Sequence, residues 1–352
     1  MIAPAPPPVP VTILSGFLGA GKTTLLNRLL ADPTLARTAV IVNEFGEIGL
    51  DHALIETSAD GIIELSDGCL CCTVRGDLVD TLDRLLDGSR PIDRIVIETT
   101  GLADPVPVLQ AVMAHPTRGT AMRLDGVVTV VDAINGARTL DAYEEAKRQV
   151  ALADRLVVSK AEPDSELDIA LRTLNPGAPR LIADRLADPA EALLDCGLVD
   201  GAKRIAVDRW LRDDAHDHEH HHPHDVSRHG ASIRSFALAH DRPIPVGAVE
   251  DFLDLLASAH GPRLLRMKGI VQVAEHPDEP LVLHAVQTVM HPPARLPAWP
   301  DANRRTRIVL IVDGIAEAWV RDLFAAFSGK PTIDRPDRAA LTNNPLAIPG
   351  LS

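Results

Sequence analysis

Short apolar runs alternate with amphipathic stretches through the first 160 residues of the chain. The runs predict buried strands over residues 11–14, 38–42, 61–65, 94–97, 126–131 and 156–158. Leucines at helical spacing predict a helix directly after residue 22, and further helices are predicted over 76–86, 105–113 and 142–152. Continuous apolar strands that alternate with helices predict an α/β fold, in which helices cover both faces of a parallel sheet.

The pattern of apolar positions changes near residue 213. Residues 213–230 contain almost no apolar side chain, and seven of the fourteen histidines fall within them, so we expect an exposed linker that packs no core. Beyond it, apolar runs predict strands over 232–238, 264–273, 281–290 and 306–312, and amphipathic stretches predict helices over 249–256 and 316–327. This order predicts a smaller α+β domain with helices on one face of its sheet.

These patterns divide the chain into five segments. We expect a flexible leader over 1–9, the α/β domain over 10–212, the His-rich linker over 213–230, the α+β domain over 231–329 and an extended tail over 330–352. The 352 residues are enough for two domains of ordinary size. No apolar run approaches the length of a membrane span, and the first residues lack the basic and apolar parts of a signal peptide.

The strongest chemical signal follows the first predicted strand. Gly16-x-x-x-x-Gly21-Lys22-Thr23 is the phosphate-binding loop pattern, and it stands after a strand and before a helix, as that loop requires. Glycines let the backbone N–H groups point inward, Lys22 can reach the outer phosphates of a nucleotide, and the Thr23 hydroxyl can hold Mg²⁺. The expected phosphate-binding residues are Gly16, Gly19, Ala20, Gly21, Lys22, Thr23 and Thr24.

A second motif, Glu98-Thr99-Thr100-Gly101, ends the predicted strand 94–97. Ligands of parallel sheets gather at such strand ends. The Glu98 carboxylate can reach Mg²⁺ through water, and the Gly101 N–H can meet the γ-phosphate. We expect Lys22, Thr23 and Glu98 to be the catalytic residues, although the same motif also suits a helix cap and turn.

A third motif, Ser159-Lys160-Ala161-Glu162, occupies the position of a base-reading loop. A carboxylate there can accept hydrogen bonds from the N1–H and the 2-amino group of guanine, which adenine does not offer. Lys160 can lie along the plane of the base. We therefore expect Ser159, Lys160 and Glu162 to contact the nucleotide base, and a plain strand-to-helix loop is the alternative.

Three of the four cysteines lie within four residues, in Gly68-Cys69-Leu70-Cys71-Cys72. Thiolates suit Zn²⁺ and similar ions, and a turn at Gly68 would let all three converge. A fourth ligand must come from elsewhere: Glu44 in the acidic stretch 43–51 is the first candidate, ahead of His52, water or a client protein. Buried or redox-active cysteines are the alternative, and the His-rich linker can bind metal loosely, as a buffer.

Composition narrows the function classes. The net charge of −14 and the pI of about 5.4 argue against a nucleic-acid-binding surface. Three cysteines so close together cannot form a spread-out disulfide framework, so a cytoplasmic protein with a metal or redox site fits better. Because apolar residues make up 46% of the chain, a real core is feasible.

These residues together resemble the CobW-type family of metal-chaperone GTPases, which includes nitrile hydratase activator proteins. The resemblance covers most of the chain. One departure lies at 159–162, because the family usually has Asn or Ser followed by Lys-Thr-Asp, where this chain has Ala161 and Glu162. The motifs that carry the resemblance are Ser15-Gly16-Phe17-Leu18-Gly19-Ala20-Gly21-Lys22-Thr23-Thr24, Asn43-Glu44-Phe45-Gly46, Gly68-Cys69-Leu70-Cys71-Cys72, Glu98-Thr99-Thr100-Gly101-Leu102-Ala103-Asp104-Pro105, Val130-Val131-Asp132-Ala133 and Arg266-Met267-Lys268-Gly269.

The resemblance implies a P-loop GTPase domain followed by a smaller C-terminal domain that helps to recognise a client. It implies binding of GTP and Mg²⁺, slow GTP hydrolysis, and Zn²⁺ (or Co²⁺) held by Cys69, Cys71, Cys72 and Glu44. It also implies delivery of the metal to a client protein under control of the nucleotide state. A kinase or ATPase with a structural zinc site is the alternative enzyme, and a metal-storing binding module is a third interpretation. The sequence leaves open whether the chain forms a homodimer.

Overall fold

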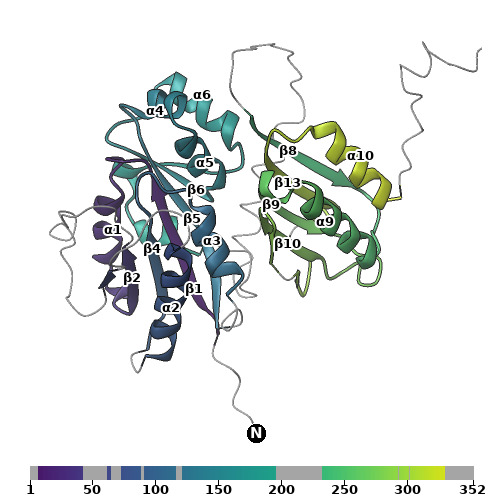
Figure 1. Ribbon diagram of the computed structural model, residues 1–352, viewed down its shortest axis with the longest axis horizontal. Helices are drawn as coiled ribbons and strands as arrows, with labels where there is room; N and C mark the ends of the chain where they lie inside the picture. Colours follow the sequence, from purple (N-terminus) through teal and green to yellow (C-terminus); the bar gives the residue numbers. More distant parts are fainter. Residues whose placement is uncertain are drawn as a thin grey trace, which may run out of the picture.

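The chain forms two domains in the computed structural model (Figure 1). The structure describes residues 7–42, 62–64, 73–88, 91–115, 121–195, 232–291, 293–300 and 302–329. Within these ranges, no helix is both long enough and apolar enough to span a membrane.

The first domain contains one parallel sheet. Its strands are β1 (Val9–Gly16), β2 (Thr38–Val42), β3 (Ile62–Glu64), β4 (Arg94–Glu98), β5 (Met122–Asp132), β6 (Arg155–Ser159) and β7 (Arg180–Ile182). Its helices are α1 (Lys22–Leu30), α2 (Thr73–Asp87), α3 (Val106–Met113), α4 (Gly136–Ala142), α5 (Glu144–Leu152), α6 (Ser165–Leu174) and α7 (Pro189–Leu193). Among the described residues the sheet has seven strands in the order β3-β2-β4-β1-β5-β6-β7, so β1 lies between β4 and β5.

Both faces of this sheet are covered by helices. Side chains alternate between the faces of a strand, and in β1 the residues Val11 and Ile13 share a core with α2, α3, α5 and α6, whereas Leu14 shares a second core with α1 and α7. Figure 1 shows the helices on the two sides of the strands. The predicted α/β fold is therefore confirmed, and each predicted strand of this domain overlaps an observed one.

The helix predicted over 142–152 is confirmed as α5, although α5 begins two residues later, after a break at Tyr143. The helix before that break, α4, was not predicted. Tyr143 is extended, with φ −130° and ψ 119°. Its ring packs on Phe17 of the phosphate loop, with the ring centroids 4.6 Å apart. The helical pattern of the sequence cannot show this contact, because it joins residues that are far apart in the chain.

Three elements between residues 159 and 213 were not predicted: α6, β7 and α7. The start of α6 carries a readable signal, because the Asp164 carboxylate caps the helix by accepting the N–H of Leu167 at 2.8 Å. The helix α2 begins at Thr73, three residues before its predicted start.

The second domain contains an antiparallel sheet. Its elements are β8 (Ile233–His240), α9 (Val246–His260), β9 (Leu264–Val271), β10 (Leu281–Val286), β11 (Val289–Met290), β12 (Ala294–Arg295), β13 (Thr306–Asp313) and α10 (Glu317–Phe327). The strand order is β11-β10-β9-β13-β8, and β12 pairs with β10. The single strand predicted over 281–290 is two strands, because Gln287 takes a φ of 54° in the turn between β10 and β11.

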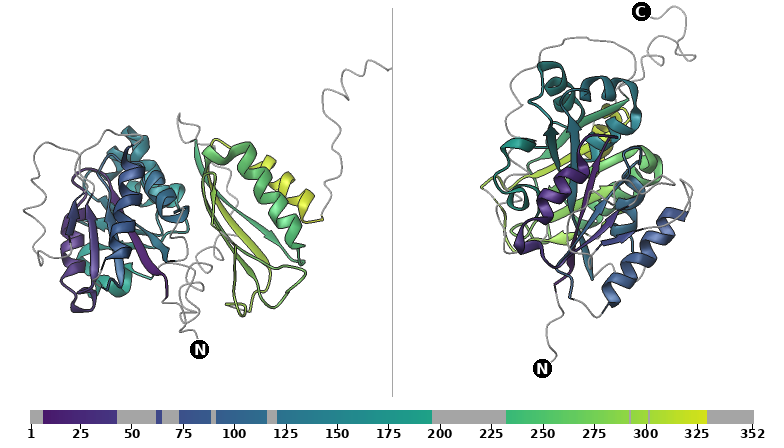
Figure 2. Two further views of the ribbon diagram at one scale, coloured as in Figure 1. Left: turned by 60° about the horizontal axis from the view of Figure 1, so that its bottom comes forward. Right: turned by 90° about the vertical axis from the view of Figure 1, so that its left-hand side faces the viewer.

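The two faces of the second sheet have different partners. The helices α9 and α10 share a core with one face, through Phe252, Leu256 and Phe324, which confirms the predicted α+β arrangement. Figure 2 shows these helices on the side turned away from the first domain. The opposite face carries Ile233, Leu265, Val286 and Ile311, which join the core of the first domain.

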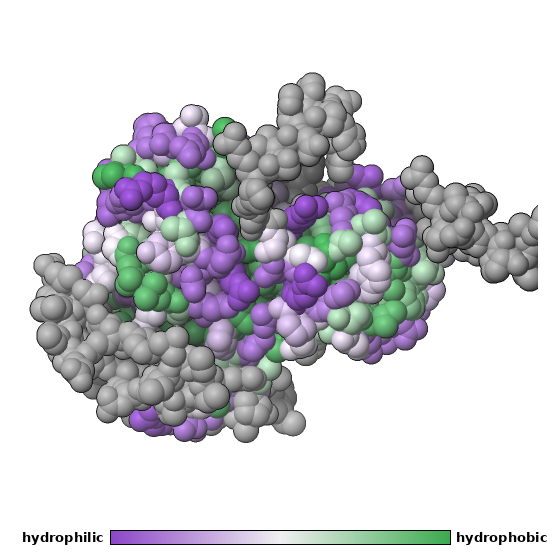
Figure 3. Space-filling view, turned by 45° about the horizontal axis from the view of Figure 1, so that its top comes forward, coloured by the Kyte–Doolittle hydropathy of each residue, from purple (hydrophilic) through white to green (hydrophobic). Residues whose placement is uncertain are grey.

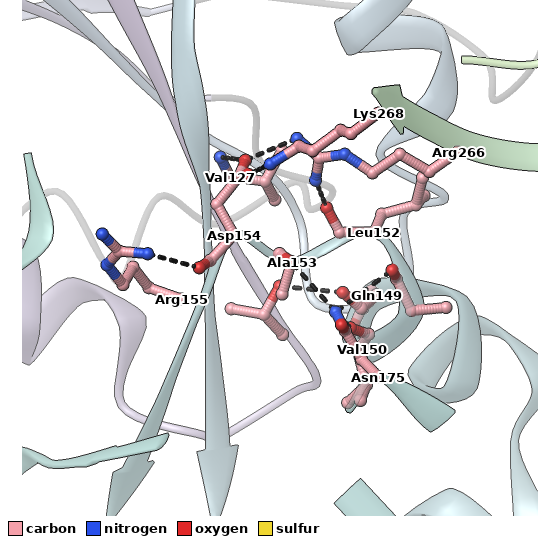
Figure 4. A network of polar contacts seen from close by, with 12 residues as sticks. Val127, Gln149, Val150, Leu152, Ala153, Asp154, Arg155, Asn175, Arg266 and Lys268 are labelled. Atoms are coloured by element: carbon pink, nitrogen blue, oxygen red, sulfur yellow. Dashed lines mark hydrogen bonds and ion pairs between the residues drawn. The ribbon is translucent and has the colours of Figure 1, made fainter. Parts of the chain in front are cut away.

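A buried cluster of charges also joins the two domains (Figure 4). Asp154, which is 6% exposed, accepts hydrogen bonds from Lys268 and, at 2.6 Å, from Arg266, both on β9. Arg266 also donates to the Leu152 carbonyl at the end of α5. The space-filling view shows hydrophilic residues beside hydrophobic ones where the domains meet (Figure 3).

The charges in this cluster shift one another's proton affinity. Burial raises the pKa of Asp154, but the two cations outweigh it and hold the pKa well below its usual range. Burial and the neighbouring Arg266 lower the pKa of Lys268 to about 8, against the opposing pull of Asp154. The cluster thus balances a buried carboxylate of one domain with cations of the other.

Candidate functional site

The phosphate-binding loop joins β1 to α1 at the carboxyl edge of the parallel sheet. Gly16 has a φ of 143°, and a Cβ there would lie 2.4 Å from the Val130 carbonyl oxygen. Only glycine fits this position, because both the backbone angle and the space exclude a side chain. Gly21 then starts α1 with a left-handed conformation, so the loop curls immediately before the helix N-terminus, which is the arrangement that binds phosphate.

Lys22 stands at the first position of α1 with its ammonium over the loop. The Nζ donates to the carbonyls of Gly16 at 3.0 Å and Phe17 at 3.3 Å. A long flexible side chain can turn from these neutral acceptors to the oxygens of a phosphate, which attract the ammonium more strongly.

Thr23 and Glu98 meet at the same edge. The Thr23 hydroxyl donates to Oε1 of Glu98 at 3.0 Å. Glu98 ends β4, which pairs with β1 so that Leu14 lies opposite Glu98, and it is 5% exposed. A hydroxyl and a carboxylate supply only oxygen donors, so this pair fits Mg²⁺, which prefers oxygen ligands.

The turn after Glu98 packs directly against the phosphate loop. A Cβ on Gly101 would lie 2.6 Å from the backbone nitrogen of Leu18, so a side chain would force the two loops apart. The Gln149 amide donates to the carbonyls of Gly101 at 3.1 Å and Ala103 at 3.0 Å. Sequence reasoning missed Gln149, although a glutamine on the buried face of an amphipathic helix is an unusual feature that marks it.

The loop after β6 holds two of the three predicted base contacts at the same edge. The Ser159 hydroxyl donates to the Ala20 carbonyl at 2.6 Å, which ties this loop to the phosphate loop. Lys160, with a φ of 69°, donates from Nζ to Asp132 at 2.7 Å. Burial raises the pKa of Asp132, but hydrogen bonds from Lys160 and Asn135 outweigh it, so the pKa lies below its usual value.

The third predicted base contact, Glu162, forms an ion pair with Arg185. Both side chains are exposed, 62% and 69% respectively. A carboxylate held by a guanidinium has to share or leave that partner before it can accept from a guanine base. The pairing with Arg185 was not visible in the sequence, because the two residues lie in different segments.

A cavity of about 310 Å³ lies between the phosphate loop, β5, α4 and α5. Its lining combines apolar groups such as Phe17 with the polar side chains of Asp132, Gln149 and Lys160. Gln149 therefore lies between this cavity and the Gly101 turn. No sequence motif indicated the cavity, because its walls come from separate elements.

The predicted zinc ligands lie outside the described residues. These are Cys69, Cys71, Cys72 and Glu44, and the same holds for His52 and for the His-rich linker. Among the residues that the structure does describe, no group of three or more His, Cys, Asp and Glu side chains is placed to hold a metal. The described strands nevertheless fix where the two loops begin: Val42 of β2 pairs with Glu98 of β4, and Glu64 of β3 pairs with Val42.

Family models match both domains. Residues 10–177 match the model described as CobW/HypB/UreG, nucleotide-binding domain. Residues 233–328 match the model described as cobalamin synthesis protein cobW C-terminal domain. The two matched segments follow each other in the order that the resemblance implied.

Individual relatives match over nearly their whole length. The chain is 31% identical to the zinc chaperone YjiA of Escherichia coli over 325 residues, which cover 90% of this chain and 98% of that protein. It is also 31% identical to the zinc chaperone CobW of a Sinorhizobium species, over 90% of this chain and 97% of that protein.

A solved structure extends the similarity to the fold. The Zn(II)-bound triple mutant of the YjiA GTPase, in which one Glu and two Cys are replaced by Ala, superposes with a TM-score of 0.63 at 27% identity. The superposition covers 91% of this chain and 99% of that one. With both domains matched and two relatives aligned over almost their full length, the chain belongs to the CobW/HypB/UreG family.

Proposed function

We propose that the protein hydrolyses GTP and carries zinc to a client protein, with metal binding controlled by the nucleotide. One observation carries the nucleotide part: the Thr23 hydroxyl on the phosphate loop bonds to Glu98 at the end of the neighbouring strand, 3.0 Å away. A phosphate loop and a buried carboxylate this close together form the donor set for a nucleotide with Mg²⁺.

Each of the described site residues has a separate role in the proposed hydrolysis. The loop N–H groups cradle the phosphates, and Lys22 turns from the Gly16 carbonyl to the outer phosphate oxygens. Thr23 and Glu98 hold Mg²⁺, which neutralises charge on the phosphates when it is bound. Gly101, wedged against Leu18, presents its N–H towards the γ-phosphate.

The zinc part of the proposal rests on the relatives and on chain connectivity. Two similar proteins are named zinc chaperones. In this chain Glu44 follows Val42 by two residues and Cys69 follows Glu64 by five. Val42 pairs with Glu98 and Glu64 pairs with Val42, so β2 and β3 end at the same edge of the sheet as β4. The loops that carry the predicted ligands therefore leave from the edge that binds the γ-phosphate, so GTP can order them and hydrolysis can release them.

The proposal also covers the compartment, nucleic acid and a second metal ion. Clustered thiolates need reducing conditions to stay available to a metal, so we place the activity in the cytoplasm. The acidic chain is not expected to bind nucleic acid. Co²⁺ is the second candidate cargo, because cysteine ligands accept both ions.

The experiment that tests the proposal is a metal competition titration. The affinity for Zn²⁺ and for Co²⁺ is measured against a chromophoric chelator with GTPγS and Mg²⁺, with GDP and Mg²⁺, and without nucleotide. We expect GTPγS to tighten binding by about five- to 150-fold, the usual range of coupling between sites. The Cys69, Cys71 and Cys72→Ser triple variant should lose this effect, whereas Cys196→Ser, the matched control, should keep it.

Affinity has to be measured rather than occupancy, because the YjiA triple mutant that lacks one Glu and two Cys was also crystallised with zinc. Binding that ignores the nucleotide, or that survives in the triple Ser variant, would contradict the proposal and assign the metal to other residues. A parallel titration with an ATP analogue tests the alternative enzyme class. In an ATPase or kinase, the ATP analogue rather than GTPγS would tighten metal binding.

A further inference from the structure

The Gly101 turn is expected to distinguish GTP from GDP, because its N–H is the expected contact of the γ-phosphate. On one side it is fixed by the phosphate loop, since a Cβ on Gly101 would lie 2.6 Å from the Leu18 nitrogen. On its other side it is fixed by α5. The position of the Gly101 N–H therefore depends on the side chains of α5 that contact the turn.

The side chain of Gln149 holds the turn from α5. Gln149 is 1% exposed, and its amide donates to the carbonyls of Gly101 at 3.1 Å and Ala103 at 3.0 Å. The helix that carries it is itself anchored, because the Thr129 hydroxyl of β5 donates to the Gln149 carbonyl at 2.9 Å. A buried amide with two carbonyl partners and an anchored backbone fixes the turn more closely than packing alone.

The preceding residue of α5, Arg148, connects the same turn to the second domain. Arg148 donates to Asp104, three residues after Gly101, at 3.2 Å and to Asp313 at the end of β13 at 3.3 Å. The end of α5 is also held by the second domain, because its Leu152 carbonyl accepts from Arg266. The helix thus contacts the γ-phosphate turn through one pair of residues and the C-terminal domain through Asp313 and Arg266.

We propose that Gln149 is a positioning residue for GTP hydrolysis, and that Arg148 makes the C-terminal domain part of the support of the Gly101 turn. This inference rests on the proposed GTPase activity. Neither residue contacts the nucleotide in this account: Gln149 acts by holding the Gly101 N–H in place, and Arg148 acts by tying Asp104 to Asp313. A displacement of about 1 Å at a reacting centre can cost on the order of a hundredfold in rate, so a distant support can matter.

The test uses the full-length protein and the Gln149→Met variant, which keeps the length of the side chain but removes both hydrogen bonds. Turnover of GTP and the affinities for GTPγS and GDP are measured. We expect kcat to fall by about ten- to a hundredfold and the GTPγS affinity to fall, whereas the GDP affinity stays within about twofold, since GDP has no γ-phosphate for the turn to meet.

The matched control is Asn175→Leu, a buried amide that directly follows α6 and bonds to the end of α5. Asn175 donates to the carbonyls of Val150, Ala151 and Ala153, so its loss loosens the end of α5 without touching the turn. We expect a lower melting temperature with an unchanged ratio of GTPγS to GDP affinity. This separates a positioning role from a general loss of stability.

Asp313→Asn tests the connection to the C-terminal domain and covers the case in which Gln149→Met does not fold. The pair is partly exposed, with side chains 37% and 24% accessible, so we expect a decrease in kcat of about two- to fivefold. The role of Gln149 is contradicted if Gln149→Met keeps the wild-type kcat and the wild-type ratio of GTPγS affinity to GDP affinity. It is also contradicted if Asn175→Leu changes these two quantities as much as Gln149→Met does. The role of Arg148 is contradicted if Asp313→Asn leaves kcat unchanged. Wild-type turnover is measured first: its absence would contradict the proposed function, and the affinity ratios would still test Gln149.

Discussion

The nucleotide edge and the domain interface both gather charged residues, but they use them differently. At the interface, buried Asp154 is matched by Arg266 and Lys268 of the other domain. At the nucleotide edge, Lys22 donates to loop carbonyls and Glu98 accepts from a hydroxyl. The interface therefore joins opposite charges of the two domains, whereas we propose that the edge holds its cation and its carboxylate for a nucleotide phosphate and Mg²⁺.

The largest effect on stability is expected from removing the buried carboxylate of Asp154. Asp154→Asn leaves Arg266 and Lys268 buried beside a neutral amide, and breaking a buried ion pair in this way costs about 3–5 kcal/mol. We expect that loss in the unfolding free energy from urea denaturation. A loss below about 1 kcal/mol would show that the cluster contributes no more than a surface ion pair. The interface would then not differ from the nucleotide edge in its contribution to stability.

The reverse change is made at the nucleotide edge. Lys22→Ala removes the cation that we propose binds the outer phosphates, and the loss of one donor that stabilises transition-state charge costs about 10²–10³ in kcat. Because Lys22 is only partly buried, we expect the unfolding free energy to change by about 0.5 kcal/mol or less. Turnover of GTP and urea unfolding on the same preparation measure both effects, and a stability loss as large as that of Asp154→Asn would contradict the division of roles.

Acid sensitivity is expected to come from the interface. The pKa of Asp154 is lowered from 3.8 in the folded protein by the two cations, against the cost of burial, so its contribution to stability is present above pH 3.8 and is lost as the pH falls through the folded value. We therefore expect the stability difference between the wild type and Asp154→Asn to narrow below pH 3.8. Urea unfolding at pH 6, 4 and 3 measures it, and a difference that is the same at all three values contradicts this assignment.

The smallest expected effect is that of an exposed ion pair. Arg304 and Asp278 are 2.9 Å apart, but their side chains are 62% and 83% exposed. We expect Arg304→Ala to change the unfolding free energy by less than about 0.5 kcal/mol and kcat not at all. This variant serves as the surface control for both Asp154→Asn and Lys22→Ala in the same assays.

Local patterns were enough to predict most of the fold and the nucleotide edge. Apolar strands such as β4 and β6 could be recognised because they are buried on both faces. The loop 16–23 could be recognised because its residue types fit phosphate binding. The break at Tyr143 was not predicted, and the contact of its ring with Phe17 joins residues that are far apart in the sequence. Gln149 and Asp154 were also missed, because their partners Ala103 and Arg266 lie 46 and 112 residues away in the chain.

The motif around Arg266 and Lys268 is an intermediate case. The sequence marked it only as part of a family resemblance, without a role. Two residues two positions apart on a strand point to the same face, so a prediction that both cations share one partner was within reach. What the sequence could not supply was the partner, Asp154, because it belongs to the other domain.

We propose that GTP hydrolysis releases zinc, and a single-turnover mixing experiment measures this release. The chain is loaded with Zn²⁺ and GTP without Mg²⁺, then mixed with Mg²⁺ and a fluorescent zinc chelator while phosphate release is recorded in parallel. We expect zinc to reach the chelator at the rate of GTP cleavage and to be retained when GTPγS replaces GTP. Zinc that leaves equally fast with GTPγS, or before any phosphate appears, would contradict the claim.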